Sequence, residues 1–510
     1  MKLTRFPLRE YCELLDREGL LSAPLSDGLD LDRAVELVSY DSKQVTEGTL
    51  FLCKGAHFKA EYLKDAAERG AFAYVSEQVY PQVDLPCIQV HDMRRALAPL
   101  AIKYYNNPAA DLDVVGITGT KGKSSTTYFL RNILDGWLSN KNGKRCGIIS
   151  SIRTYDGVED FESHMTTPEP LELHKHFANA VESGLGVTVM EVSSQALKYH
   201  RTLDTHFAVA CFLNIGCDHI SPIEHPDFED YFRSKLKIFS QAEVSCINLD
   251  SDHTDEVLAA ARKSGGKVIT FSHEDSSADL YAEDIRKEGN SILFRVGEQQ
   301  YKLSTPGLFN VENALAAMAV CTALGVPEEY IAEGLWKTSV PGRMEINISE
   351  DGRVVTIVDY AHNRMSFETL FSSVHAEYPN HRVVSVFGCP GMKAFDRRRD
   401  LGEVAGKGSD FVVITEDDSG EEDTRSICNE IAVHVEAQGC PYRIELNRGE
   451  AIRQAILGCE EPTVVVVAGK GPETHQKRGL EFVDTPPDAQ YAEAFLREYN
   501  AKHRVGNTTK

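Results

Sequence analysis

Residues 116–127 read GITGTKGKSSTT, and this stretch decides the fold because it needs a strand before it and a helix after it. The run DVVGIT at 113–118 has the apolar character of a buried strand. After the loop, apolar residues recur at the i, i+3, i+4, i+7 spacing of one helix face, at Leu130, Ile133, Leu134 and Trp137. A helix that begins directly after a glycine turn points its free N–H groups at an anion. The stretch therefore predicts a phosphate-binding loop in an α/β fold.

The residue types in this loop suit a nucleotide phosphate and magnesium. Gly119 and Gly122 allow close approach of the backbone, Lys123 can reach the β- and γ-phosphates, and Ser124 can hold Mg²⁺. The spacing departs from the standard P-loop, which has glycine five residues before Gly122, where this chain has Ile117. The alternative interpretation is a glycine-rich turn without a ligand.

The composition indicates a multidomain globular protein. The chain has 510 residues, which at about 150 residues per domain predicts three domains. Apolar residues make up 42% and charged residues 26%, as in soluble globular proteins. The formal net charge of −23 argues against nonspecific nucleic-acid binding, which needs a basic face.

Membrane and thiol chemistry are not expected. The opening sequence MKLTRFPLREYCELL lacks the apolar centre of a signal peptide, and no later apolar run is long enough to span a bilayer. We therefore expect a cytoplasmic protein without a membrane partner. The 12 cysteines are scattered without a Cys-x-x-Cys pair, so neither a zinc site nor a disulfide framework is expected.

Three segments with different patterns are expected: 1–111, 112–340 and 341–510. The first has strand-like runs at 49–53 and 71–75 with a helical stretch between them. In the second, strands alternate with helices, which predicts a mostly parallel, doubly wound sheet. The third repeats this pattern with VVTIVDY, RVVSVFG, DFVVIT and TVVVVAG, typical of a second, Rossmann-type sheet.

Polar residues stand at the ends of two central strands. Glu191 ends the run GVTVMEV, and Asp218 and His219 follow the run VACFLNI. Ligands bind at this edge of open α/β sheets, and a carboxylate there suits Mg²⁺. Helix capping by Asp218 and a surface position for His219 are the alternatives. By pattern alone, Lys235 in DFEDYFRSKLKIF is one lysine on a solvated helix face.

The motifs GTKGKSS, TTPE, EVSSQAL…R, NIGCDH, PGRME, DYAH and GKGPE occur in this order across the chain. Together they resemble the Mur ligase family, in particular its tripeptide-forming (MurE) type. The N-terminal stretch DSKQVTEGTLFLCKGAHFK resembles the family's uridine-nucleotide-binding domain. The resemblance implies an N-terminal α/β domain for UDP-substrate binding, a central P-loop ATPase-like parallel sheet, and a C-terminal Rossmann-like domain for amino-acid binding.

The resemblance also implies an activity. Members of this type use ATP to phosphorylate the γ-carboxylate of D-glutamate in UDP-MurNAc-L-Ala-D-Glu, and a free diamino acid then displaces the phosphate. The implied cofactors are ATP and Mg²⁺, and the implied setting is peptidoglycan precursor synthesis by a cytoplasmic monomer. Lys123 and two Mg²⁺ ions would stabilise the negative charge that both steps gather.

The resemblance assigns roles to individual residues. ATP would be held by Gly119, Thr120, Lys121, Gly122, Lys123, Ser124, Ser125, Asn313, Arg343 and Asp359. The UDP-muramyl-dipeptide would contact Ser42, Thr166, Thr167, Ser194 and Arg201. Mg²⁺ would be held by Ser124, Glu191, His219 and Lys235, the last as a carbamate formed with CO₂. The catalytic group would comprise Lys123, Glu191, His219 and Lys235, and the amino acid would contact Arg398, Asp417, Asp418, Gly469 and Glu473.

Several positions depart from the family pattern. Lys121 replaces the usual asparagine, and Gln195 and Pro472 replace histidines. Members that add meso-diaminopimelate carry Asp-Asn-Pro-Arg where this chain has DDSG, so Gly420 stands in place of the arginine that forks the second carboxylate. The neighbouring acids Asp418, Glu421 and Glu422 suit a side-chain ammonium instead. We therefore favour L-lysine, with diaminopimelate and L-ornithine as alternatives.

Other functions stay open at this point. A P-loop kinase or NTPase needs the phosphate loop but not the DYAH and GKGPE motifs. A non-catalytic paralogue, and a related ligase acting on folate or cyanophycin, are further alternatives.

Overall fold

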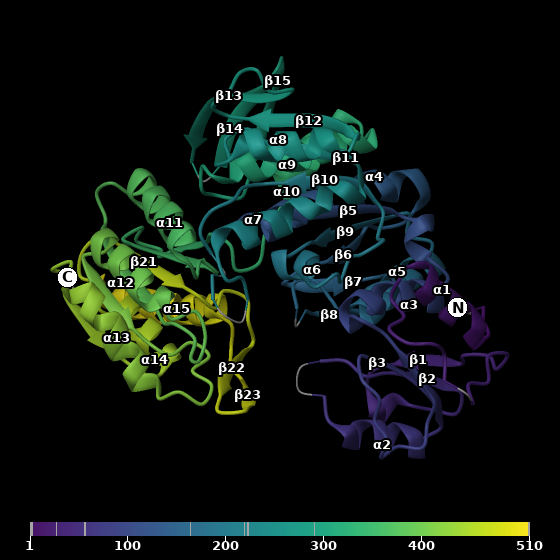
Figure 1. Ribbon diagram of the computed structural model, residues 1–510. Helices are drawn as coiled ribbons and strands as arrows, with labels where there is room; N and C mark the ends of the chain where they lie inside the picture. The colour runs from purple at the N-terminus through teal and green to yellow at the C-terminus, as the bar shows by residue number, and fades with distance from the viewer. Residues whose placement is uncertain are drawn as a thin grey trace.

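The computed structural model describes residues 4–26, 28–55, 58–163, 165–218, 220–221, 224–289 and 291–507. It contains three units, each built around its own sheet (Figure 1). The main sheets lie within residues 37–89, 113–303 and 345–468. The predicted α/β fold class with three sheets is therefore confirmed, whereas boundaries near 111 and 340 stay a prediction. No helix in the described ranges is long and apolar enough to cross a membrane.

The N-terminal unit has four parallel strands in sequence order. The strands are β1 (Leu37–Ser39), β2 (Thr49–Leu52), β3 (Ala71–Ser76) and β4 (Cys87–Gln89). The helices are α1 (Leu8–Arg17), α2 (Ala60–Glu68) and α3 (Met93–Tyr104), with the short η1 (Ser42–Gln44). Leu50 and Leu52 pack with α1 and α3, whereas Phe51 packs with α2. Since both faces are covered, these strands read as continuous apolar runs.

The central unit holds an eleven-stranded sheet. Its parallel part runs in the spatial order β6 (Gly147–Ile149), β9 (Val187–Glu191), β5 (Asp113–Thr118), β10 (Phe207–Phe212), β11 (Ala242–Asn248) and β12 (Lys267–Ser272). One edge continues with β13 (Leu280–Glu288), β14 (Ser291–Val296) and β15 (Gln299–Leu303), and the other with β7 (Arg153–Tyr155) and β8 (Asp160–Glu162). The pairs β6–β7, β7–β8, β13–β14 and β14–β15 are antiparallel, an extension that the sequence analysis did not predict.

Helices cover both faces of this sheet. One face packs on α4 (Lys123–Asn142), α9 (Asn310–Leu324) and α10 (Glu328–Lys337). The other packs on α5 (Pro170–Glu182), α7 (Phe228–Leu236) and α8 (Thr254–Lys263). The short helices are α6 (Ser194–Lys198), η2 (Pro108–Asp111) and η3 (Lys237–Gln241). Leu130, Ile133 and Leu134 are buried and Trp137 packs beside them, as the helical spacing predicted.

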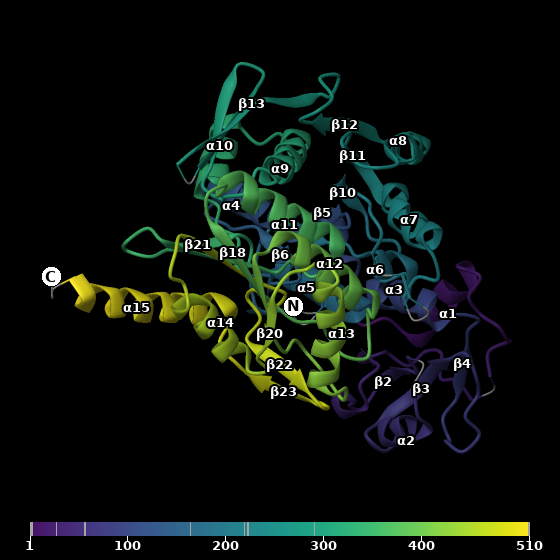
Figure 2. The same cartoon turned by 90° about the vertical axis from the view of Figure 1, so that its left-hand side faces the viewer.

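The C-terminal unit has six strands in the spatial order β16 (Glu345–Ile348), β17 (Val354–Asp359), β21 (Thr463–Ala468), β18 (Arg382–Phe387), β19 (Phe411–Ile414) and β20 (Tyr442–Ile444). All pairs are parallel except β16–β17. Figure 2 shows the sheet between α11 (Arg364–Glu377), α12 (Asp396–Gly408) and α13 (Thr424–Glu436) on one side and α14 (Arg448–Leu457) and α15 (Asp488–Asn507) on the other. A separate hairpin is formed by β22 (His475–Arg478) and β23 (Glu481–Asp484).

The close contact between α4 and α10 gives a stability prediction. A Cβ atom at Gly334 would lie 2.6 Å from Cα of Ile133 in the facing helix, whereas one at Gly136 would lie 3.8 Å from Cδ1 of Tyr330. We expect Gly334→Ala to lower the free energy of unfolding by about 1–3 kcal/mol through overpacking. Gly136→Ala is the matched control, because Gly136 lies in the middle of α4 on its exposed side. This variant should raise the free energy of unfolding by about 0.5–1 kcal/mol. Urea denaturation measures both, and equal effects of the two variants would contradict this packing.

Candidate active site

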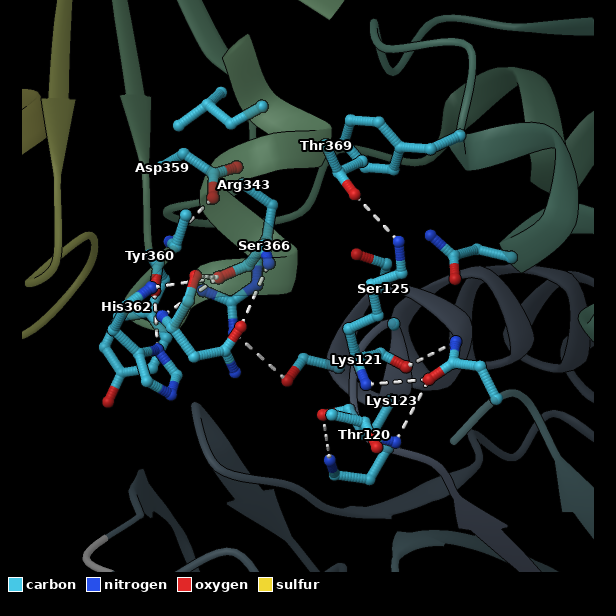
Figure 3. Close-up of a pocket in the computed structure, with 18 of the residues that line it drawn as sticks. Thr120, Lys121, Lys123, Ser125, Arg343, Asp359, Tyr360, His362, Ser366 and Thr369 are labelled. Carbon is cyan, nitrogen blue, oxygen red and sulfur yellow. Dashed lines mark hydrogen bonds between the residues drawn. The ribbon is translucent and has the colours of Figure 1, made fainter. Parts of the chain in front are cut away.

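A cavity of about 240 Å³ lies between the carboxyl edge of the central sheet and the C-terminal unit. Figure 3 shows the phosphate loop on one wall and side chains from residues 343 to 369 on the other. Nine of the ten residues predicted to hold ATP line it: Thr120, Lys121, Gly122, Lys123, Ser124, Ser125, Asn313, Arg343 and Asp359. The tenth, Gly119, supplies a backbone carbonyl to the same loop. Two segments about 220 residues apart therefore form one site.

The phosphate loop is shaped by a glycine with positive φ and by hydrogen bonds to the neighbouring strand end. Gly122 precedes α4 with φ of +83°, and a Cβ atom there would lie 2.3 Å from Oδ1 of Asn313. A side chain at this position would therefore push away a residue of the cavity wall. From the neighbouring strand end, Oδ1 of Asn214 accepts hydrogen bonds from the backbone N–H groups of Thr120 (3.1 Å) and Lys121 (3.0 Å). The loop is thus fixed from β10 as well as from its own helix.

Two lysines meet at one carbonyl oxygen of this loop. Nζ of Lys123 lies 2.8 Å and Nζ of Lys235 lies 2.9 Å from O of Gly119. Lys235 is 2% exposed, so the expectation of a solvated helix face is wrong for this residue. Burial lowers the pKa of both lysines, and the neighbouring charge of Lys123 drives the pKa of Lys235 further down. Both effects favour the neutral amine form of Lys235 over the ammonium.

Oxygen atoms gather beside this lysine pair. Glu191 is 1% exposed, and its Oε1 accepts hydrogen bonds from N (2.9 Å) and Oγ (3.2 Å) of Ser151. Oγ of Ser151 lies 3.0 Å from Oγ of Ser124. This row of a carboxylate and two hydroxyls suits a hard cation such as Mg²⁺. His219, predicted as another ligand, lies outside the described residues.

The C-terminal wall of the cavity is fixed by a buried carboxylate. Asp359 accepts hydrogen bonds from the backbone N–H groups of Met344 and Ala361, both at 2.8 Å. Burial raises the pKa of Asp359. These bonds tie the segment that carries Arg343 to the end of β17, and the Arg343 guanidinium lies over the Tyr360 ring at 4.5 Å. The predicted Arg343 and Asp359 therefore act as one structural unit.

Polar contacts cross the cavity between the two units. Nζ of Lys121 donates to Oγ1 of Thr369 on α11 at 2.8 Å, as Figure 3 shows. Nδ2 of Asn363 donates to Oδ2 of Asp218 at 2.7 Å. Sequence analysis missed Thr369 and Asn363, although Asn363 directly follows the DYAH motif. The cation at Lys121 thus reaches the opposite wall rather than lying only along the phosphate loop.

The residues predicted for the UDP-muramyl-dipeptide are spread over two units. Thr166 lines the cavity, whereas Ser42 lies in the N-terminal unit. Oγ1 of Thr167 donates to the carbonyl of Glu191 (3.0 Å), and Oγ of Ser194 hydrogen-bonds to His225 (3.0 Å).

Two ion pairs connect this region with the N-terminal unit. Arg201 pairs with Glu169 (2.8 Å), and Glu169 also pairs with Lys54 of the N-terminal unit (2.8 Å). These contacts form a polar path from the cavity towards the N-terminal unit.

The acidic run at residues 415–423, which follows β19, has several of its carboxylates paired with lysine or arginine side chains. Asp418 accepts a hydrogen bond from Nζ of Lys470 at 2.8 Å, and Glu422 pairs with Arg398 at 2.7 Å. Arg398, predicted to hold a carboxylate of the amino acid, is 3% exposed and also pairs with Glu430. Asp418 and Glu422 are therefore already paired with cations, and the contact of this run with a side-chain ammonium stays a prediction.

Among the described acids of this run, the exposed Glu421 and the buried Asp417 form no hydrogen bond or ion pair. Asp417 is only 9% exposed. Burial raises its pKa to about 6. Gly469 has φ of +111°, and a Cβ atom there would lie 2.8 Å from Oδ2 of Asp417. Glu473 lies near this group and accepts a hydrogen bond from the Tyr360 hydroxyl at 2.7 Å, which connects it to the nucleotide-side cavity.

Comparison with known proteins gives the family. Residues 117–321 match the Mur ligase middle domain, and residues 342–471 match the Mur ligase, glutamate ligase domain. The UDP-N-acetylmuramoyl-L-alanyl-D-glutamate–L-lysine ligase of Enterococcus faecalis is 37% identical over 98% of this chain and 100% of its own. The UDP-N-acetylmuramyl-tripeptide synthetase of Lactobacillus acidophilus is 36% identical over 89% of this chain and 90% of its own.

Solved structures share the fold. A UDP-N-acetylmuramoyl-L-alanyl-D-glutamate–2,6-diaminopimelate ligase superposes with a TM-score of 0.64, at 21% identity, over 98% of this chain and 100% of its own. The ligase MurF of Thermotoga maritima in complex with ADP superposes with a TM-score of 0.59, at 18% identity, over 92% of this chain and 99% of its own. The chain belongs to the Mur ligase family, in its MurE-type branch.

The buried amine of Lys235 gives a chemical prediction. A neutral amine can attack the carbon of CO₂, forming an N–C bond and releasing a proton, whereas an ammonium cannot. We expect ¹³C NMR of the protein in ¹³C-labelled bicarbonate to show a carbamate carbon that Lys235→Ala removes. Lys237→Ala, which deletes an exposed lysine two residues further on, is the control and should keep the signal. A spectrum without the signal in the unaltered protein would contradict the assignment.

Proposed function

We propose that the protein is a UDP-N-acetylmuramoyl-L-alanyl-D-glutamate–L-lysine ligase of peptidoglycan precursor synthesis. The observation that carries this proposal is the hydrogen bond from Tyr360, which lines the nucleotide-side cavity, to Glu473 beside the buried Asp417. Activation at the phosphate loop and capture of an amine are thereby brought to adjoining sites. The names of the L-lysine-adding relatives support the same assignment.

In this proposal each unit has one task. Residues 1–111 bind the uridine nucleotide, residues 112–340 bind ATP, and residues 341–510 bind the amino acid. The polar path through Lys54, Glu169 and Arg201 supports a substrate that extends from the first unit to the cavity. We propose that the protein works as a monomer in the cytoplasm, where ATP and nucleotide-linked precursors occur.

The reaction takes two steps. An oxygen of the D-glutamate γ-carboxylate attacks the γ-phosphorus of ATP, giving an acyl phosphate and ADP. The amine nitrogen then attacks the acyl carbon, the bond between that carbon and the bridging oxygen breaks, phosphate leaves, and the nitrogen loses a proton. Lys123 stabilises the charge on the phosphate oxygens, and the backbone N–H groups at the start of α4 do the same. Closure of the C-terminal wall keeps water from the acyl phosphate.

Magnesium fits the row of oxygen atoms beside the loop. Ser124 and Glu191 would hold it directly, and a carbamate on Lys235 would add a further anionic oxygen. When bound, the ion supplies positive charge to the phosphate oxygens. Glu191 supports this fit because its buried carboxylate has hydrogen bonds from Ser151 but forms no salt bridge within the described residues.

An assay of amino-acid acceptors tests the function. With ATP and UDP-MurNAc-L-Ala-D-Glu, we expect release of ADP to require an added diamino acid and to be fastest with L-lysine, slower with L-ornithine and slowest with meso-diaminopimelate. The physical reason is that Asp417 favours an ammonium and repels a second carboxylate. Release of ADP without the amino acid would indicate a kinase or NTPase, and diaminopimelate as the best acceptor would overturn the lysine assignment.

The raised pKa of Asp417 gives a pH dependence. Its carboxylate must be ionised to hold a side-chain ammonium, and burial sets its pKa at about 6. The KM for lysine should therefore rise by about tenfold for each pH unit below 6 and level off above it. Asp417→Asn should raise KM at pH 8 and abolish this dependence, because the amide does not titrate. Steady-state kinetics from pH 5 to 8 provide the measurement, and an unchanged profile in the variant would refute the role of Asp417.

A further inference from the structure

A second carboxylate, Glu416, stands next to Asp417 and is held by an arginine. Nε of Arg478 lies 3.0 Å from Oε2 of Glu416, and Nη2 lies 2.6 Å from Oε1, so the pair is bidentate. The Glu416 side chain is 10% exposed, whereas that of Arg478 is 48% exposed. The acid is therefore enclosed, while its partner reaches solvent.

The pair lines a small cavity of about 50 Å³ at the carboxyl edge of the C-terminal sheet. Glu473 and Lys470 line the same cavity, so it adjoins the group around Asp417. Its other cations are also neutralised: Arg448 forms a bidentate pair with Asp488 at 2.6 and 2.7 Å, and Lys470 contacts Asp418 and Glu473. Each of the three cations that line this cavity is therefore already paired with a carboxylate.

Backbone hydrogen bonds place Arg478 beside Gly420. This is the position where members that add meso-diaminopimelate carry an arginine. N of Gly420 donates to O of Lys477 (3.1 Å), and O of Gly420 accepts from N of Gly479 (2.7 Å). These two bonds bracket Arg478. A Cβ atom at Gly420 would have only one neighbour within 4 Å, O of Gly479 at 3.9 Å, so the space beside it is open. The backbone of Arg478 therefore lies beside Gly420, and its guanidinium reaches Glu416.

We propose that Glu416 is a specificity-determining residue for the incoming amino acid, because its carboxylate occupies the Arg478 guanidinium that would otherwise bind a second carboxylate on the substrate side chain. Guanidinium groups bind carboxylates by two parallel hydrogen bonds, and Glu416 takes both bonds of the Nε–Nη2 edge and neutralises the charge of Arg478. The same carboxylate has further lone pairs, which an ammonium can share. The cavity thus accepts a diamino monocarboxylate and rejects a diamino dicarboxylate. This inference rests on the proposed ligase function and identifies the residues that choose its substrate.

The test is Glu416→Gln, which keeps the shape of the side chain and removes its charge. Because Arg478 is half exposed, the variant leaves a solvated cation rather than a buried one, and the fold should persist. We expect the ratio of kcat/KM for meso-diaminopimelate to kcat/KM for L-lysine to rise by about tenfold or more, the size of a charge-assisted hydrogen-bonded contact. Adding Arg478→Gln to this variant should return the ratio to its original value.

The matched control is Glu498→Gln. Glu498 forms a bidentate pair with Arg453 on the exposed surface of the same unit, so the charge change is equal but lies outside the cavity. This variant should leave the ratio within about twofold of the unaltered protein. A Glu416→Gln protein that turns over lysine with an unchanged ratio would overturn the inference and leave the ligase function standing. An unaltered protein that turns over neither amino acid would instead overturn the proposed function.

Discussion

The structure depends on two lysine side chains that share one carbonyl oxygen. Lys123 and Lys235 reach Gly119 from different helices; Lys235 is only 2% exposed, whereas Lys123 lines the cavity. Two ammonium groups so close together repel each other, and burial together with this repulsion lowers the pKa of Lys235, which favours its neutral form. One lysine can therefore neutralise phosphate, while the other is left as an amine able to react. This arrangement requires that the phosphate loop, α4 and α7 hold their positions relative to one another.

The needs of phosphate binding explain why the site lies between the central and C-terminal units. A loop that binds phosphate needs anchoring on one side and a second wall that excludes water on the other. Asn214 supplies the anchor, and Lys121 extends from the loop to Thr369 of the C-terminal unit. Asp359 holds the opposite wall in shape through two backbone hydrogen bonds. The nucleotide region and the amino-acid region are thus coupled through a few polar contacts that bridge the two sheets.

Much of the fold follows from local pattern. The strand before Gly119 and the helix face of Leu130 and Ile133 are fixed by apolar spacing, and the parallel strands of both larger sheets read as apolar runs because they are buried on both faces. The edges of the central sheet escaped prediction because short strands such as β8 are exposed and carry no apolar alternation. Within the site, a motif can identify Lys235 but cannot show that it is buried. Likewise, the pairing of Asp418 with Lys470, 52 residues away, depends on tertiary structure that no local pattern encodes.

In the proposed reaction the cavity makes an acid reactive by attaching phosphorus to it. The most direct measurement uses UDP-MurNAc-L-Ala-D-Glu whose γ-carboxylate carries ¹⁸O, with mass spectrometry of the inorganic phosphate released during turnover. If an acyl phosphate forms, the bridging oxygen leaves with phosphorus, and each phosphate released carries one ¹⁸O atom. Phosphate without the label, formed alongside the amide product, would contradict the account.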